Sequence, residues 1–318
     1  MGIIMCNIGI DLGGTNIAAG IVDEKGKIIR KDSTPTKMPR SAEEIIKDMA
    51  ILSLKLIEDA GISVNDVESI GIGTPGAAND ATGIVEYSNN LDFHNVPMRT
   101  IMQKYIDKPV HIGNDANVAA LGEAFAGAAK GVNDAVMITL GTGVGGGIII
   151  DKKIYSGFNF YGGELGHMVI DKDGRACTCG RKGCWEAYSS ATGLTVMTKE
   201  AMENDKNSLM WELCSGDINN AGAKTAFAAM KKGDKAGKEV VDMYIAYLAC
   251  GLANIINIFQ PEIIAIGGGV CNEGDYLTKP LEAAILQEVY TRSTTGSTQI
   301  KIAMLGNDAG IIGAAMQK

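Results

Sequence analysis

The sequence Ile8-Gly9-Ile10-Asp11-Leu12-Gly13-Gly14-Thr15 places a short apolar strand directly before a turn made of two glycines and a threonine. A related pattern occurs at Ile138-Thr139-Leu140-Gly141-Thr142-Gly143, and in both places a second apolar strand follows the turn. Unhindered backbone N–H groups and a hydroxyl at a strand end are typical of phosphate-binding turns. Two copies of one strand–turn–strand unit indicate an internal duplication.

These glycine turns match neither of the common nucleotide motifs. Neither is followed by the Gly-Lys-Ser/Thr of a P-loop, and the G-x-G-x-x-G at residues 141–146 leads into a strand rather than a helix. One such turn alone is more often a plain hairpin, but a third, Gly267-Gly268-Gly269, follows the apolar segment 262–266. Three together favour phosphate binding. Asp11 is then placed to orient a water on Mg²⁺, which keeps most of its waters and takes one or two carboxylates.

Strands and helices alternate along the chain, which predicts α/β architecture with a parallel or mixed sheet. Ser41 and Glu44 have the spacing of a capping box and predict a helix start. A chain of 318 residues is too long for one typical core, so two domains are expected. The predicted strands cover residues 6–11, 17–22, 27–30, 67–73, 109–113, 135–140, 147–150 and 262–266, and predicted helices include 115–129, 240–258 and 307–316.

Three cysteines, Cys177, Cys179 and Cys184, lie within eight residues, and His167 precedes the first by ten. A Cys3His set is typical of a closed, tetrahedral, structural zinc site. The alternatives are disulfides or unrelated thiols for the cysteines, and a hydrogen-bonded core residue for His167. An odd total of seven cysteines disfavours full disulfide pairing. Such a metal would brace the loop that carries two acids, Glu164 and Glu186.

Asn114-Asp115 follows a predicted strand and begins an alanine-rich helix. One interpretation is an ordinary helix N-cap. The other is a carboxylate at the carboxyl end of a strand, where open α/β sheets bind ligands. In phosphoryl transfer to an alcohol, such a carboxylate accepts the hydroxyl proton. Asn114, Glu164 and Glu186 would then contact neighbouring hydroxyls and distinguish one sugar from another.

The composition excludes several classes of protein. A net charge of −8 disfavours binding to nucleic acid. No uninterrupted apolar run reaches the length of a membrane span, and the N-terminal residues lack the pattern of a signal peptide. Free thiols without an export signal predict a cytoplasmic protein with no membrane partner.

The sequence resembles the ROK family (repressor, open reading frame, kinase) over essentially its whole length, and bacterial ROK glucokinases most. The resemblance rests on the two glycine turns, on Gly113-Asn114-Asp115-Ala116-Asn117, on Glu164-Leu165-Gly166-His167 and on the cluster from Cys177 to Glu186. It implies an actin-like (ribonuclease H-like) ATPase fold, with two α/β domains flanking a cleft that holds ATP and a sugar. We expect the smaller domain over residues 1–118, joined by a C-terminal helix at 306–318, and the larger one, with its zinc-bound loop, over 119–305.

The resemblance also implies roles for single residues in ATP-dependent phosphorylation of a hexose, a glycolytic reaction in the case of glucose. Asp115 is the catalytic base, and ATP binds with Mg²⁺. The implied sugar contacts are Gly76, Asn90, Asn114, Asp115, Glu164, His167 and Glu186; the implied nucleotide contacts are Asp11, Gly13, Gly14, Thr15, Thr142, Gly143, Gly268 and Gly269; the implied zinc ligands are His167, Cys177, Cys179 and Cys184.

One departure from the family loosens the choice of glucose. Many family glucokinases carry a Trp-Arg or similar pair after Asn-Leu, whereas Asn90-Leu91 is followed here by Asp92-Phe93-His94. Glucose is the first candidate, and fructose, allose and N-acetylhexosamines such as N-acetylmannosamine are the alternatives. A sugar-responsive repressor is disfavoured, because those relatives carry an N-terminal helix-turn-helix extension and only seven residues precede Ile8. The family also implies a homodimer or homotetramer.

Overall fold

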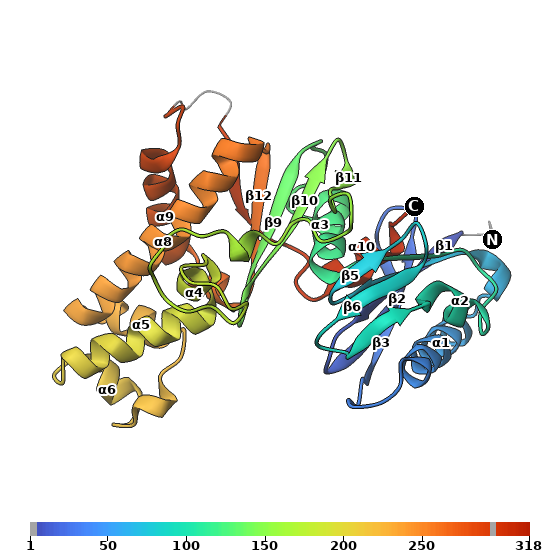
Figure 1. The fold of residues 1–318 in the computed structure, drawn as a ribbon, viewed down its shortest axis with the longest axis horizontal. Helices are drawn as coiled ribbons and strands as arrows, with labels where there is room; N and C mark the ends of the chain where they lie inside the picture. Colours follow the sequence, from blue (N-terminus) through green and yellow to red (C-terminus); the bar gives the residue numbers. More distant parts are fainter. Residues whose placement is uncertain (1–4, 293–296) are drawn as a thin grey trace. The chain divides into compact units, whose positions relative to one another are not determined.

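The computed structural model describes residues 5–292 and 297–318, which form two compact units (Figure 1). The first unit combines Met1–Met137, Gly147–Gly163 and Ala303–Lys318, and the second combines Ile138–Gly146 and Glu164–Ile302. The domain boundary expected after residue 118 lies inside helix α3 (Asp115–Ala126), all of which belongs to the first unit. The first unit thus extends farther along the chain than we expected, and it contains the C-terminal segment.

The first unit is built on a five-stranded sheet with the order β3-β2-β1-β4-β8. Strands β1, β2 and β3 form antiparallel hairpins, whereas β1, β4 and β8 run parallel. The predicted strands are present, most with slightly longer bounds: β1 (Cys6–Leu12), β2 (Asn16–Asp23), β3 (Ile28–Pro35), β4 (Val67–Thr74) and β8 (Val110–Asn114).

Helix α1 (Ala42–Asp59) begins as the sequence predicts. The Ser41 hydroxyl accepts a hydrogen bond from the backbone N–H of Glu44, and the Glu44 carboxylate accepts one from the N–H of Ser41. Its apolar face packs against the sheet and shares a core with Ile8 and Ile10 of β1. This capping box satisfies N–H groups that the first helical turn leaves without partners.

The opposite face of the sheet is covered by α10 (Asp308–Ala315) through glycines. A Cβ atom added to Gly9 of β1 would lie 1.8 Å from the Ile311 carbonyl oxygen, and one added to Gly71 of β4 would lie 1.7 Å from that of Ala314. Because successive residues of a strand face opposite sides, Gly9 faces α10 while Ile8 and Ile10 face α1. Backbone therefore packs directly on backbone here, which only glycine permits.

A second sheet repeats the connectivity of the first. Its order is β11-β10-β9-β12-β13, so both sheets run third, second, first, fourth, fifth in chain order. This common order supports the internal duplication predicted from the glycine turns. The strands are β9 (Ala135–Leu140), β10 (Val144–Ile150), β11 (Lys153–Ile154), β12 (Ile263–Gly267) and β13 (Gln299–Ile302).

Several short elements were not predicted. Strands β5 (Ala77–Asn79), β6 (Ile84–Ser88) and β7 (Phe93–Val96) form a small antiparallel sheet, and α2 (Met98–Gln103) follows them. The second unit adds α4 (Glu186–Ser189), α5 (Ala191–Asn204), α6 (Leu209–Leu213), α7 (Thr225–Lys231) and α9 (Asp275–Glu288). Single 3₁₀ turns occur at Val64–Asp66, Leu165–His167, Ile218–Asn220 and Gly269–Glu273.

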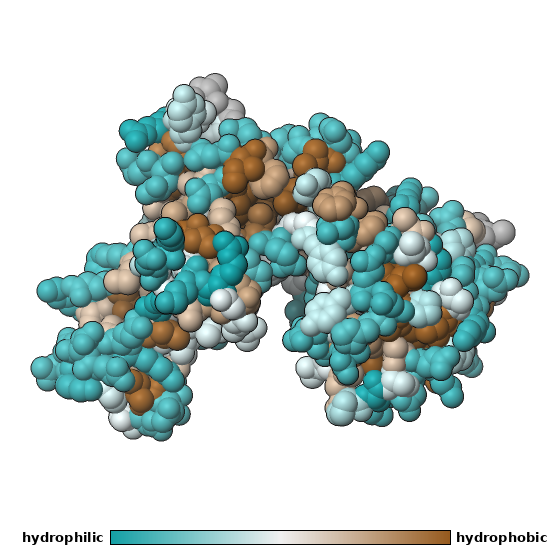
Figure 2. Space-filling view, viewed as in Figure 1, coloured by the Kyte–Doolittle hydropathy of each residue, from teal (hydrophilic) through white to brown (hydrophobic). Residues whose placement is uncertain are grey.

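The long helix α8 (Lys235–Phe259) is the centre of the second unit and contacts α5, α7 and α9. By length and composition alone it could cross a membrane, but 56% of its most apolar window is buried inside the protein. This burial is that of a core helix. Figure 2 shows hydrophilic residues over most of the visible face, with smaller hydrophobic areas between them.

Candidate active site and metal loop

In the first unit, the predicted acids meet at the carboxyl edge of the parallel strands. Asp11 of β1 lies opposite Gly73 of β4, and Gly73 lies opposite Gly113 of β8. Asp115 begins α3 directly after β8. Strand register thus brings Asp11 and Asp115, which are 104 positions apart in the sequence, to the same edge. This is the edge at which open α/β sheets bind ligands.

Burial makes both carboxylates unusual acids. It raises the pKa of Asp11 to about 6, and the negative charge of Asp115 adds to the effect. Burial also raises the pKa of Asp115, although hydrogen bonds from the Ala116 and Asp115 backbone and from Asn114 oppose the rise. Gly310 leaves room for this arrangement, since a Cβ atom there would lie 2.6 Å from an Asp11 carboxylate oxygen. Perturbed carboxylates of this kind are typical of functional sites.

Asn114, and not Asp115, caps helix α3. The Asn114 Oδ1 accepts hydrogen bonds from the N–H groups of Ala116 at 3.0 Å and Asn117 at 3.2 Å. Its Nδ2 donates to the carbonyl of Gly76 at 3.2 Å, so Gly76 and Asn114 lie side by side. Gly76 has a φ of +94°, and a Cβ atom there would lie 2.0 Å from the Tyr87 carbonyl oxygen. The two interpretations of Asn114-Asp115 are therefore compatible, because Asn114 caps the helix and the Asp115 carboxylate remains available for another role.

The first glycine turn is held by Thr36, a residue that the sequence did not single out. The Thr36 hydroxyl donates to the carbonyl of Gly13 at 2.6 Å, and its N–H donates to the carbonyl of Thr15 at 2.8 Å. Asn90 lies beside the turn, since a Cβ atom on Gly14 would be 3.6 Å from its carbonyl oxygen. Thr15 and Asn90 are both exposed. The turn thus presents backbone and polar side chains to solvent.

The loop that departs from the family pattern follows Asn90. Phe93 is only 2% exposed and belongs to the core of the first unit. Asp92 and His94 flank it at the surface, with 3.5 Å between the Asp92 carboxylate and the His94 ring. The buried Phe93 side chain therefore holds this segment on the core, whereas Asp92 and His94 are exposed to solvent.

The second glycine turn is joined to Glu186, a contact that the sequence did not reveal. The Glu186 Oε2 accepts a hydrogen bond from the N–H of Val144 at 2.9 Å. A Cβ atom on Gly143 would lie 2.2 Å from that same oxygen, so a larger residue there would displace the Glu186 carboxylate. The carbonyl of Thr142 accepts from the Thr192 hydroxyl at 2.7 Å. Gly268 lies against this region, since a Cβ atom there would be 2.2 Å from the Leu140 carbonyl oxygen.

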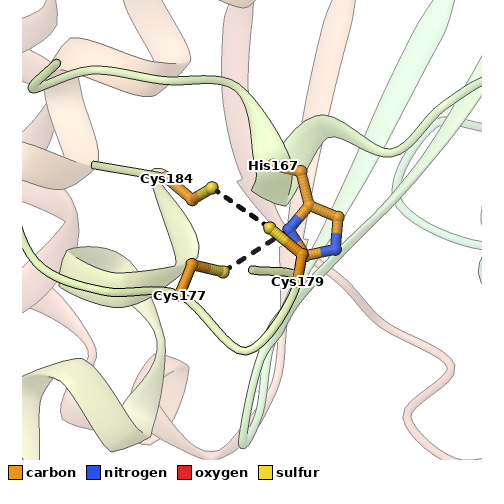
Figure 3. Close-up of side chains that lie close together, drawn as sticks. All are labelled: His167, Cys177, Cys179 and Cys184. Atoms are coloured by element: carbon orange, nitrogen blue, oxygen red, sulfur yellow. Dashed lines mark hydrogen bonds between the residues drawn. The ribbon is translucent and has the colours of Figure 1, made fainter. Parts of the chain in front are cut away.

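His167, Cys177, Cys179 and Cys184 converge on one point (Figure 3). Their ligand atoms lie within 4.8 Å of one another. The distance from Cys177 Sγ to His167 Nδ1 is 3.7 Å, and that from Cys179 Sγ to Cys184 Sγ is 3.6 Å. A tetrahedral zinc ion with Zn–S bonds of about 2.3 Å would space its ligands at about 3.7 Å. The donor set and its spacing therefore fit zinc, and disulfides are not formed.

Electrostatics at the cluster favours a bound cation. Burial, together with the neighbouring Cys179 and Cys177, raises the pKa of Cys184 to about 12. A metal ion would supply the positive charge that thiolates need in this position. Cys177 Sγ also lies 3.7 Å from the Glu186 Oε1, so the cluster is in direct contact with the acid that holds the second glycine turn.

The loop around the cluster has little regular structure and depends on two special contacts. Gly183 has a φ of +73°, and a Cβ atom there would lie 1.5 Å from the Asp171 carbonyl oxygen. Trp185, fully buried, fits against Gly251 of α8, and its Nε1 donates to the Tyr247 carbonyl at 3.0 Å. Trp185 anchors one end of the loop on α8, whereas Glu164 at the other end is exposed.

The predicted residues thus form two groups, one in each unit. Each group is assembled within its own unit by the contacts above. Of the site residues predicted from the sequence, the first unit carries Asp11, Gly13, Gly14, Thr15, Gly76, Asn90, Asn114 and Asp115, and the second carries Thr142, Gly143, Glu164, His167, Cys177, Cys179, Cys184, Glu186, Gly268 and Gly269. Thr36, Val144 and Trp185 are additional structural partners. Trp185 lies within the cluster from Cys177 to Glu186 and Val144 within the G-x-G-x-x-G segment, whereas Thr36 lies outside every motif described above.

Comparison with known proteins identifies the family of the chain. The family model "ROK family" matches residues 7–317. The glucokinase of Thermotoga maritima is 37% identical over 309 residues, which cover 97% of this chain and 95% of that protein. The xylose repressor of Caldicellulosiruptor bescii is 29% identical, and the match covers 96% of this chain and 76% of the repressor.

Solved structures give the same result. The ROK glucokinase of Streptomyces griseus, in complex with glucose and AMPPNP, has a TM-score of 0.77 and 33% identity, with 98% of each chain covered. The ROK hexokinase of Thermus thermophilus has a TM-score of 0.80 and 31% identity, covering 98% of this chain and 97% of that one. The predicted actin-like ATPase fold is confirmed. This chain belongs to the ROK family, which its sequence matches from residue 7 to residue 317.

Proposed function

We propose that this protein is an ATP-dependent hexose kinase, and that it converts glucose and ATP to glucose 6-phosphate and ADP. The observation that carries the proposal is the partly buried carboxylate of Asp115, whose pKa burial raises, at the carboxyl edge of the parallel strands beside the capping residue Asn114. The similarity to glucokinases and to a ROK glucokinase with bound glucose and AMPPNP supports it.

Asp115 acts as the general base. It accepts the proton of the sugar hydroxyl as the hydroxyl oxygen forms a bond to the γ-phosphorus of ATP, and the bond from that phosphorus to the leaving ADP oxygen breaks. A carboxylate with a raised pKa is a stronger base than an exposed one, because its pKa lies closer to the working pH. The hydrogen bond from the Ala116 N–H, 2.8 Å from Oδ1, keeps the carboxylate in place.

Asp11 would hold, through water, the Mg²⁺ that accompanies ATP. Burial and the negative charge of Asp115 raise the pKa of Asp11 to about 6, which means that its negative charge is poorly stabilised. A divalent cation nearby would stabilise that charge, so the surroundings of Asp11 fit Mg²⁺. The ion neutralises charge on the phosphates when it is bound. Gly13, Gly14 and Thr15 would contact the phosphates in the first unit, Thr142 and Gly143 would do so in the second, and Gly268 and Gly269 would lie near the adenosine.

The sugar would be bound by Asn114, Asp115, Glu164, His167 and Glu186. Gly76 and Asn90 complete the proposed set of sugar contacts. Zinc held by His167, Cys177, Cys179 and Cys184 would fix the loop between Glu164 and Glu186, so its role is structural. We also propose that the protein is cytoplasmic and forms a homodimer or homotetramer, as the family resemblance implies.

A second candidate is the same reaction on another hexose or an N-acetylhexosamine, for example fructose, allose or N-acetylmannosamine. The sequence Asp92-Phe93-His94 after Asn90-Leu91 supports keeping this alternative, because it differs from many family glucokinases at the same place. A sugar-responsive repressor has weaker support, since regulation alone would not require the buried base.

The decisive experiment measures ADP release by the purified protein with ATP, Mg²⁺ and one sugar at a time. The panel contains glucose, mannose, fructose, allose, N-acetylglucosamine and N-acetylmannosamine. The highest kcat/KM with glucose is expected. A preference for another sugar would be consistent with the proposed mechanism but would show that glucose is not the main substrate. No ADP release with any sugar, from protein that binds ATP, would refute the kinase.

A further inference from the structure

A pocket of about 460 Å³ lies in the first unit beside the proposed base, and Asn114 is the one residue of its lining to which a role is given above. It is lined by α3, by the β10–β11 hairpin with the segment that follows, and by the last residues after α10. All of its lining residues belong to the first unit. Its volume is in the range of small-molecule sites.

The pocket contains a buried polar atom without a partner. Asn117 is 3% exposed, and its Oδ1 makes no hydrogen bond with any residue that the structure describes. Asn114, Asn117 and Leu121 all line the pocket and are spaced three and four residues apart, so one face of α3 is directed into it. A buried carbonyl oxygen without a donor loses its hydration, and rotation of the Asn117 side chain toward the pocket would let a ligand hydroxyl restore a hydrogen bond.

The β10–β11 hairpin supplies positive charge. Lys152 and Lys153 line the pocket, are exposed, and form no ion pair with a residue in the described parts of the chain. The one acid of the lining, Asp80, already accepts hydrogen bonds from Arg99 at 2.7 Å and from the N–H of Ile112 at 2.9 Å. The available side-chain charge of the pocket is therefore positive, which suits an anionic ligand.

The remaining surface suits a small organic body. Leu121, Ile154 and Phe160 provide apolar contacts around the buried amide. We propose that this pocket binds a small phosphate ester that carries free hydroxyl groups, with the phosphate at Lys152 and Lys153 and a hydroxyl donating to Asn117. The ligand would also touch Asn114, which contacts Gly76 and precedes Asp115, so the pocket is a site from which turnover can be regulated.

Isothermal titration calorimetry with a matched pair of probes tests this proposal without relying on catalysis. sn-Glycerol 3-phosphate has two hydroxyls, and propyl phosphate has none. One equivalent of glycerol 3-phosphate should bind, and propyl phosphate should bind at least about fivefold more weakly, the loss expected for one neutral hydrogen bond. Equal affinity for the two probes would refute the role of Asn117.

Two sets of variants locate the site. Lys152→Gln with Lys153→Gln should weaken binding about tenfold or more, since hydrogen bonds to charged groups are the stronger ones. The control, Lys27→Gln with Lys47→Gln, makes the same change of charge at exposed lysines outside the pocket and should bind as the wild type does. Asn117→Leu should abolish the difference between the two probes; should that variant fail to fold, the probe pair in the wild type still decides the role of the hydroxyl.

The competing explanation is binding of the phosphate at the glycine turns. In that case the Lys152/Lys153 variant would bind both probes normally, and saturating AMPPNP would displace them. Either result, or no binding of glycerol 3-phosphate at millimolar concentration, overturns the proposal. Failure of the kinase assay would leave these binding results unaffected.

Discussion

The two units position their acids in different ways. In the first unit, Asp11 and Asp115 are placed by parallel strands and by a helix cap, all of which are regular structure. In the second, Glu186 begins a helix of only four residues and is held by a loop with isolated backbone bridges and a cluster of four side chains that could hold a metal ion. A carboxylate on a strand or helix is positioned by the fold itself, whereas one on an irregular loop needs a cross-link.

The largest effect is expected in the first unit, at the base. Asp115→Ala should lower kcat by about 10²–10⁴-fold, the usual contribution of a general base. Its stability should not fall, because a buried carboxylate with a raised pKa is removed. The measurements are steady-state ADP release and thermal unfolding.

The control for that variant is Asp107→Ala, at an exposed acid in the same unit. It should retain normal turnover. If Asp115→Ala and the control both had near-normal activity, Asp115 would not be the general base. The first unit would then have no proposed catalytic residue.

The next effect should be confined to the second unit. Cys179→Ser should lower bound zinc and reduce activity about 10–100-fold, the effect typical of damage to a metal site's surroundings. Structural zinc contributes folding free energy directly, so the loop should become accessible to protease. Zinc analysis and limited proteolysis measure the two effects.

Cys250→Ser is the matched control, since that cysteine lies outside the cluster. If Cys179→Ser made the first unit as accessible to protease as the second, the proposed difference between the two units would be wrong. Fully active protein without any zinc would contradict the bracing role itself.

A third test concerns pH and the first unit alone. The folded pKa of Asp11, about 6, exceeds the ordinary 3.8, so protonation favours the folded state. The contribution of this group to stability is complete below pH 3.8 and is lost as pH rises through 6. A difference of about two pKa units corresponds to a loss on the order of 2–3 kcal/mol at pH 7.

Asp11→Asn should therefore be more stable than the wild type at pH 7, with the advantage fading toward pH 4. Urea unfolding of the substrate-free protein at both values of pH measures it. The same protonation should lower kcat/KM of the wild type as pH falls below 6. An Asp11→Asn protein that is less stable than the wild type at pH 7 would contradict the assigned cause.

The smallest expected effect comes from adding one methyl group to the second glycine turn. Gly143→Ala would place Cβ 2.2 Å from the Glu186 oxygen, whereas Gly141→Ala would meet nothing within 4 Å. The first change should raise the KM for the sugar about tenfold, within the range of typical point mutations. The second should leave it unchanged. Equal KM values would show that the contact between the second turn and Glu186 does not matter for sugar binding.

The sequence predicted what is local or periodic. The strands before each glycine turn, the Ser41–Glu44 capping box and the cysteine cluster all follow from patterns within a few residues. The repeated turn predicted an internal duplication, which the common strand order of the two sheets supports. The helix predicted to extend to residue 129 ends at Ala126 instead. Glu123 explains that end, because its buried carboxylate accepts hydrogen bonds from the N–H groups of Ala128 and Leu305.

Contacts between distant segments could not be predicted. The hydrogen bond from the Val144 N–H to the Glu186 carboxylate joins positions 42 residues apart, and no pattern in either segment predicts it. The strands β5 to β7 are three to five residues long, too short for alternation to stand out. Asn117 looks like an ordinary residue in the first turn of a helix, and only the packing around it leaves its oxygen without a partner.

The glycine-mediated packing of α10 has a consequence for how the protein is made. Gly9 and Gly71 receive the backbone of Ile311 and Ala314, so strands β1 and β4 lack this cover until α10, more than 200 residues later in the sequence, has been synthesised. A ribosome synthesises roughly 5–20 residues per second, and the sheet of the first unit therefore stays uncovered on one side for tens of seconds. The nascent chain must keep this face of the sheet free of other partners until α10 has left the exit tunnel.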